Sequence, residues 1–88
     1  MSEIEQIRSS YKLRQHLIDK HTAWILEQVR SNDDNYLNVN PIVDRLVERQ
    51  PGVTRYTLRR TVTKVIELQG GERINPRGVY RVEKILKN

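Results

Sequence analysis

The chain has 88 residues, enough for one small domain and too few for a second hydrophobic core. Hydrophobic residues make up 36% of it and charged residues 31%, a balance typical of a soluble globular domain. The absence of cysteine excludes disulfides and thiolate metal sites. Because the start of the chain, MSEIEQIRSS, contains acids and no apolar run, we expect neither a signal peptide nor a membrane span there, and we expect a cytoplasmic location.

The net charge of +5 is concentrated in the second part of the chain. Residues 1–52 carry seven Lys or Arg against eight Asp or Glu, a balance of −1, whereas residues 53–88 carry nine against three, a balance of +6. This asymmetry indicates an electrostatic footprint confined to one region. The alternative is a solvated basic surface that keeps a small protein soluble.

The first predicted element is a helix over about Ile4–Arg30. Apolar residues recur there every seven positions, at Ile4, Tyr11, Ile18 and Ile25, with others widening the stripe. Ser9-Ser10 leaves two interpretations open: one long helix, or a short arm followed by a helix that Ser10 caps.

The early part of this stripe exceeds what the core of a small domain requires. A core formed by residues 17–88 needs the later part of the stripe, around Leu17, Trp24, Ile25 and Val29. This leaves Ile4, Ile7 and Tyr11 over on an arm of residues 1–16. Surplus apolar residues on a helix favour contact with a second copy, although the arm folding back or fraying is the alternative. We therefore predict a homodimer whose interface includes Ile4, Ile7, Tyr11 and Ile18.

A short strand and a second helix are predicted next. After a loop over 31–35, the alternating run 36–39 is a candidate for a strand that pairs with a later hairpin. The helix then begins with Asn40 as N-cap and Pro41 in its first position. It ends at Gln50-Pro51-Gly52, because proline cannot continue a helix and glycine accommodates the turn.

The third predicted helix begins at Thr54, its N-cap, and ends at Gly70-Gly71. At 3.6 residues per turn its core-facing stripe consists of Leu58, Val62, Val65, Ile66 and Gln69. The opposite side presents Arg55, Tyr56, Arg59, Arg60, Thr63 and Lys64. The pattern therefore predicts a helix with an apolar back and a basic front.

Residues 72–83 are typical of a β-hairpin. A three-residue loop, Pro76-Arg77-Gly78, with positive φ at Gly78, places Asn75 opposite Val79. In this register Ile74, Tyr80 and Val82 share one face, and Arg73 and Arg81 share the other. The tail can return Ile85 and Leu86 to the core.

Motifs for catalysis or metal binding are absent from the sequence. His16 and His21 are five residues apart, which does not place them on one helix face at metal-ligand spacing, and we expect them at the surface or an interface. Gly70-Gly71 follows no strand, so it is not a phosphate-binding loop. We therefore expect neither an enzyme nor a bound metal, cofactor or small molecule.

The order helix, turn, basic helix, hairpin over about residues 17–83 resembles the winged helix-turn-helix superfamily of DNA-binding regulators. Small phage, plasmid and archaeal regulators of this kind often consist of little else. The resemblance rests on the order of elements, and it implies a mainly α fold with a small β-hairpin (α+β). Three helices and a wing would form a domain of residues 17–88, preceded by the helical arm of residues 1–16.

The resemblance also implies a site and a partner. The third helix would enter the major groove of double-stranded DNA, and the Arg-tipped wing would reach the minor groove or the backbone. The residues expected to contact DNA are Thr54, Arg55, Tyr56, Thr57, Arg59, Arg60, Thr63, Lys64, Arg73, Arg77 and Arg81. A transcriptional regulator, associated with the nucleoid if bacterial or archaeal, is the expected function.

Other functions are weighed against this one. A winged helix used for protein contacts and a DNA-organising protein without strong sequence specificity are the main alternatives. Glu67 is the only acid within residues 55–69, which favours DNA over a protein partner. RNA binding usually requires several stacking aromatics on a sheet, and Tyr80 alone gives it little support. A membrane-surface role is disfavoured because the apolar stripe of the basic helix is needed for the core.

Overall fold

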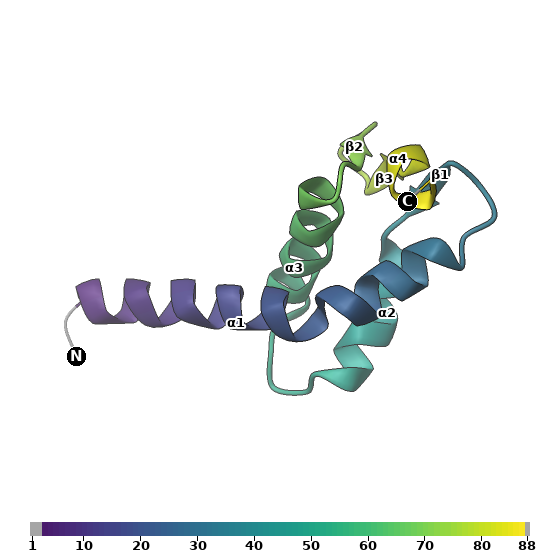
Figure 1. The fold of residues 1–88 in the computed structure, drawn as a ribbon. Helices are drawn as coiled ribbons and strands as arrows, with labels where there is room; N and C mark the ends of the chain where they lie inside the picture. Colours follow the sequence, from purple (N-terminus) through teal and green to yellow (C-terminus); the bar gives the residue numbers. More distant parts are fainter. Residues whose placement is uncertain (1–2, 88) are drawn as a thin grey trace.

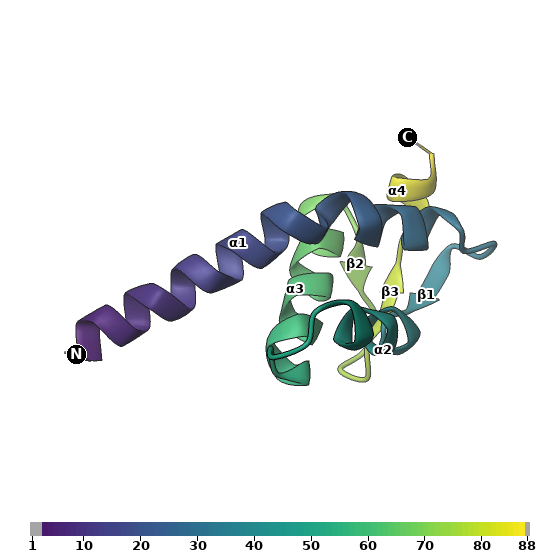
Figure 2. The ribbon, with the colours of Figure 1, turned by 90° about the horizontal axis from the view of Figure 1, so that it is seen from below.

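The protein folds as an α+β domain in which helices pack with a small antiparallel sheet (Figures 1 and 2). The computed structural model describes the backbone of residues 3–87 and the side chains of residues 12–87. Its elements are α1 (Glu3–Arg30), β1 (Tyr36–Asn38), α2 (Asn40–Arg49), α3 (Arg55–Leu68), β2 (Glu72–Arg73), β3 (Val79–Arg81) and α4 (Glu83–Leu86).

Helix α1 is continuous over 28 residues, so the interpretation as one long helix is confirmed and Ser10 does not begin a second one. Its second half packs against α3 and α4, whereas its first half extends beyond the rest of the domain (Figure 2). The fold is elongated as a result, with extents of 46 × 23 × 23 Å.

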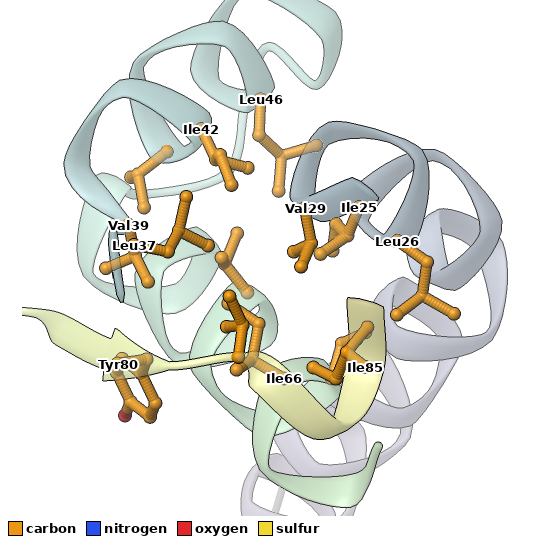
Figure 3. Close-up of a cluster of buried hydrophobic side chains, with 14 of the residues drawn as sticks. Ile25, Leu26, Val29, Leu37, Val39, Ile42, Leu46, Ile66, Tyr80 and Ile85 are labelled. Atoms are coloured by element: carbon orange, nitrogen blue, oxygen red, sulfur yellow. The ribbon is translucent and has the colours of Figure 1, made fainter. Parts of the chain in front are cut away.

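The core lies between the second half of α1, helices α2 and α3, the sheet and α4 (Figure 3). Ile85 is buried there and Leu86 packs against it, which confirms that the tail returns to the core. Ile18 also belongs to this cluster and is only 8% exposed, so it is not the free dimer contact that we predicted. The other three predicted dimer residues, Ile4, Ile7 and Tyr11, lie outside the described side chains.

The predicted stripe on α3 is largely confirmed. Four of its members form part of the core: Leu58, Val62, Val65 and Ile66. Gln69 does not, because the helix ends at Leu68 and Gln69 becomes its exposed C-cap. Thr61 is buried in its place, and its hydroxyl donates a hydrogen bond to the Thr57 carbonyl at 2.9 Å, which satisfies the buried polar group.

The predicted helix ends are confirmed with one correction. The Thr54 hydroxyl accepts a hydrogen bond from the backbone N–H of Thr57 at 3.2 Å, so Thr54 is the N-cap of α3. Asn40 is not the N-cap of α2, because the helix already includes it and Val39 holds the cap position without a side-chain bond. The Asn38 side chain instead accepts the Asn40 N–H at 2.9 Å. The turn at Pro51-Gly52 follows α2 as predicted, with Gly52 at a φ of 87°.

The hairpin forms, but its register differs by one residue from the prediction. Arg73 pairs with Tyr80, and the Ile74 N–H donates to the Val79 carbonyl at 2.9 Å, so the loop has four residues rather than three. The cause is the Asn75 side chain, whose oxygen accepts the N–H groups of Arg77 and Val79 at 2.9 and 3.3 Å and closes the wider loop.

This register changes which hairpin residues share a face. Arg73 lies on the face of Tyr80, and Ile74 and Arg81 lie on the other, so neither the predicted Arg73–Arg81 face nor the predicted place of Ile74 is correct. Ile74 is 51% exposed, whereas Tyr80 and Val82 are buried. The predicted strand at 36–39 is confirmed as β1, which pairs with β3 in the sheet order β1-β3-β2.

Among residues 3–87, no helix combines the length and apolar character that crossing a membrane requires.

The turn after α3 depends on Gly71. A β-carbon added there would overlap the Ile66 side chain and lie 2.9 Å from the Ile66 carbonyl oxygen, which accepts the Gly71 N–H at 2.8 Å. We expect Gly71→Ala to lower the free energy of unfolding by about 1–3 kcal/mol, because the core must shift to admit the methyl group. Urea denaturation followed by circular dichroism measures this, and an unchanged midpoint would contradict the packing described.

Candidate nucleic-acid interface

A basic groove runs along α3 between the hairpin and α1, with a volume of about 770 Å³. Three elements line it: α3 along its length, α1 on one side and the β2–β3 hairpin on the other. Its cations are Arg14 from α1, Arg59, Arg60 and Lys64 from α3, and Arg73 from β2. Glu67 is the only carboxylate among the lining residues, so the groove has a strongly positive potential.

The α3 side of the groove is a single helical stripe. Residues 56, 59, 60, 63, 64 and 67 are spaced by three or four, which aligns them on one face of a helix. The buried stripe around Leu58, Val62 and Val65 occupies the opposite face. Burial of the apolar stripe therefore directs the basic stripe into the groove. Five residues of α3 that were predicted to contact DNA lie together there: Tyr56, Arg59, Arg60, Thr63 and Lys64.

Arg60 and Tyr56 form a pair at the exposed start of this stripe. The guanidinium donates to the Tyr56 hydroxyl at 3.0 Å and lies 5.7 Å from the ring centre, a cation–π arrangement. The hydrogen bond and the charge of Arg60 lower the pKa of Tyr56. Only one Arg60 donor is used by this bond, so the remaining guanidinium N–H groups are available to a ligand.

Arg59 has a different role, because it connects α3 to the hairpin loop. Its Nη2 donates to the Pro76 carbonyl at 3.5 Å, and a β-carbon on Gly78 would lie 3.1 Å from the same atom. Asn40 contacts the loop from α2, donating to the Arg77 carbonyl at 3.4 Å. The loop that carries the exposed Arg77 side chain is thus held from two helices.

Tyr80 and Glu67 join the hairpin to the far end of the stripe. The Tyr80 hydroxyl donates to Glu67 Oε1 at 3.0 Å, and burial together with this carboxylate raises the pKa of Tyr80. Arg73, opposite Tyr80 in the register, also reaches the groove. Sequence reasoning missed the Tyr80–Glu67 pair, since it needs the correct hairpin register.

The remaining predicted residues lie apart from the groove. Arg55 forms an ion pair with Asp44 of α2 at 2.5 Å, because it lies only about 60° around the helix from Leu58 and so faces α2. Arg81 is on the outer face of the sheet and pairs with Glu83 at 2.6 Å. Thr54 and Thr57 are hydrogen-bonded to each other at 3.0 Å at the start of α3.

Arg14 and Gln15 of α1 are groove residues that sequence reasoning did not identify. The available signal was the spacing, because Arg14 lies one turn before the buried Ile18 and therefore at the edge of the apolar stripe.

The two histidines differ from each other. His16 is exposed, in agreement with the expected surface or interface position, whereas His21 is only 5% exposed and does not lie at the surface. Its Nε2 lies 2.9 Å from Gln50 Oε1, so it joins α1 to the end of α2. Within the part of the chain that the structure describes, no three His, Cys, Asp or Glu side chains gather as metal ligands would.

Comparisons with known proteins give no match to a family model, a curated protein or a solved structure. The function proposed below therefore rests on the groove itself.

The outer ion pairs generate a pH prediction. Lys87 and Arg81 donate to the Glu83 carboxylate at 2.9 and 2.6 Å and lower its pKa from 4.5 to about 2. A carboxyl whose pKa is lower in the folded state stabilises the fold above its ordinary pKa, and this stabilisation is lost as the pH falls through the folded pKa. We expect the stability difference between wild type and Glu83→Gln to be full above pH 4.5 and to vanish towards pH 2.

Denaturant titrations at several pH values measure this difference. A difference that does not change with pH would contradict the ion pairs at Glu83, as would an NMR titration of the Glu83 carboxyl with a midpoint near 4.5.

Proposed function

We propose that this protein binds double-stranded DNA as a small winged helix-turn-helix protein, with α3 in the major groove. The order α2, turn, α3, hairpin and the sheet order β1-β3-β2 support this interpretation of the α+β fold. The observation that carries the proposal is the basic stripe of α3, which lies opposite its buried stripe and is bordered by the hairpin.

Electrostatics favours a polyanion as the ligand. Five cations and one carboxylate line the groove, and each cation that reaches a phosphate releases counterions from DNA. The cations that form ion pairs with acids of the protein, Arg55, Arg81, Lys84 and Lys87, do not line the groove. The cations that line the groove have no ion-pair partner among the described side chains, so their charge is available to a ligand.

The α3 side chains divide into reading and positioning groups. Arg60 and Lys64 are exposed and carry donors for base edges or phosphates, and a bidentate arginine–guanine contact gives roughly 1–3 kcal/mol of discrimination. Arg59 holds the hairpin loop, which presents Arg77 to the minor groove or the backbone. Transcriptional regulation by a homodimer that associates through the arm completes the proposal.

Substitution on the two faces of the domain tests the interface. We expect Arg60→Ala and Lys64→Ala each to weaken binding to a fluorescein-labelled 20-base-pair duplex severalfold in fluorescence anisotropy at low salt. Arg81→Ala removes the same charge from the outer face of the sheet and should leave the affinity nearly unchanged. Equal losses in all three variants, or no binding by wild type, would refute the assignment of α3.

Glu67 provides a test in the opposite direction. It is the single carboxylate lining the groove, so Glu67→Gln should raise the affinity for duplex DNA severalfold by removing repulsion of the phosphates. Glutamine can still accept the Tyr80 hydrogen bond, which preserves the local structure. Glu27→Gln, an equal charge change at an exposed position of α1 that does not line the groove, is the matched control. An unchanged or lower affinity in Glu67→Gln would mean that DNA does not approach this groove.

A further inference from the structure

We infer that α1 is the second wall of the DNA interface and that Arg14 contacts the phosphate backbone on the side of the major groove opposite the hairpin. This inference rests on the proposed function and extends it to an element that the helix-turn-helix arrangement does not include.

The groove has a cation on each side of α3. Arg14 lines it from α1, and Arg73 lines it from β2. A major groove is about 12 Å wide and is bordered by one phosphate backbone on each side. A helix lying in it therefore brings one backbone to each of its flanks, and here each flank is bordered by a wall that carries an arginine.

Arg14 is available for this contact. It is half-buried in the groove wall, and among the described side chains no carboxylate lies within ion-pair distance of it. Its charge also reaches α3: the pKa of Tyr56 is lowered chiefly by Arg60 and, to a smaller extent, by Arg14. Of the α1 residues that line the groove, Arg14 is the only charged one, and the neutral Gln15 beside it donates to Asp19 at 3.0 Å.

Lys12 is a matched control on the same helix. It is exposed and does not line the groove, because two residues of separation place it about 160° around the helix from Arg14. Lys12→Ala and Arg14→Ala therefore each remove one positive charge from the same turn of α1, and they remove it from opposite sides of the helix.

The experiment measures the affinity of wild type, Lys12→Ala, Arg14→Ala and Arg73→Ala for a 20-base-pair duplex across a series of salt concentrations. One lost phosphate contact reduces the slope of log K against log salt by about 0.9. We expect this reduction, with a severalfold loss of affinity at low salt, for Arg14→Ala and for Arg73→Ala. Lys12→Ala should keep the wild-type slope, and Arg14→Lys should recover most of the affinity, since a phosphate accepts either cation.

Each outcome separates this inference from the function on which it rests. If wild type binds and Arg73→Ala loses a contact while Arg14→Ala matches Lys12→Ala, the α1 wall is refuted and DNA binding by α3 and the hairpin stands. If wild type binds no duplex at low salt, both are refuted. Circular dichroism and urea denaturation of Arg14→Ala establish that the variant is folded, and Arg14→Gln, which keeps most of the side-chain length, serves as the second variant if it is not.

Discussion

The packing of α3 against the core determines the orientation of the basic side chains that this helix contributes to the groove. Leu58, Val62 and Ile66 are completely buried, and Val65 is 2% exposed, so the helix cannot rotate about its axis without exposing them. Because a helix repeats every 3.6 residues, this constraint directs residues 56, 60 and 64 to the opposite side. The basic face is thus a consequence of the apolar stripe, and a mutation that loosens the core would disturb the interface without touching it.

The charged side chains differ in whether the protein itself supplies an acid beside them. Two cations outside the groove are paired with acids of the protein itself, Arg55 with Asp44 and Arg81 with Glu83. The cations lining the groove face a single carboxylate, and that carboxylate is engaged by the Tyr80 hydroxyl. The total charge of the chain therefore says less about binding than the gathering of five cations around one carboxylate in the groove.

Local periodicity and turn chemistry allowed much of this fold to be predicted. The stripes of α1 and α3, the turn at Pro51-Gly52, the cap at Thr54 and the hairpin all depend on interactions within a few residues. The register of the hairpin was not predictable in the same way, because it is decided by whether the Asn75 side chain accepts the N–H of Arg77 and of Val79. In the observed register Arg73 lies on the same face of the hairpin as Tyr80, and both residues line the groove.

Residues that meet only through tertiary packing were the ones missed. Arg14 reaches the groove because α1 crosses α3, and His21 is buried because the end of α2 brings Gln50 to it.

The most direct test of the account is a titration of ¹⁵N-labelled protein with duplex DNA, followed by NMR. We expect amide shifts concentrated in residues 14–15, 55–64 and 73–78, with Tyr36 and Arg81 on the outer face of the sheet unaffected. Shifts centred on that outer face, or no shifts at all, would contradict it.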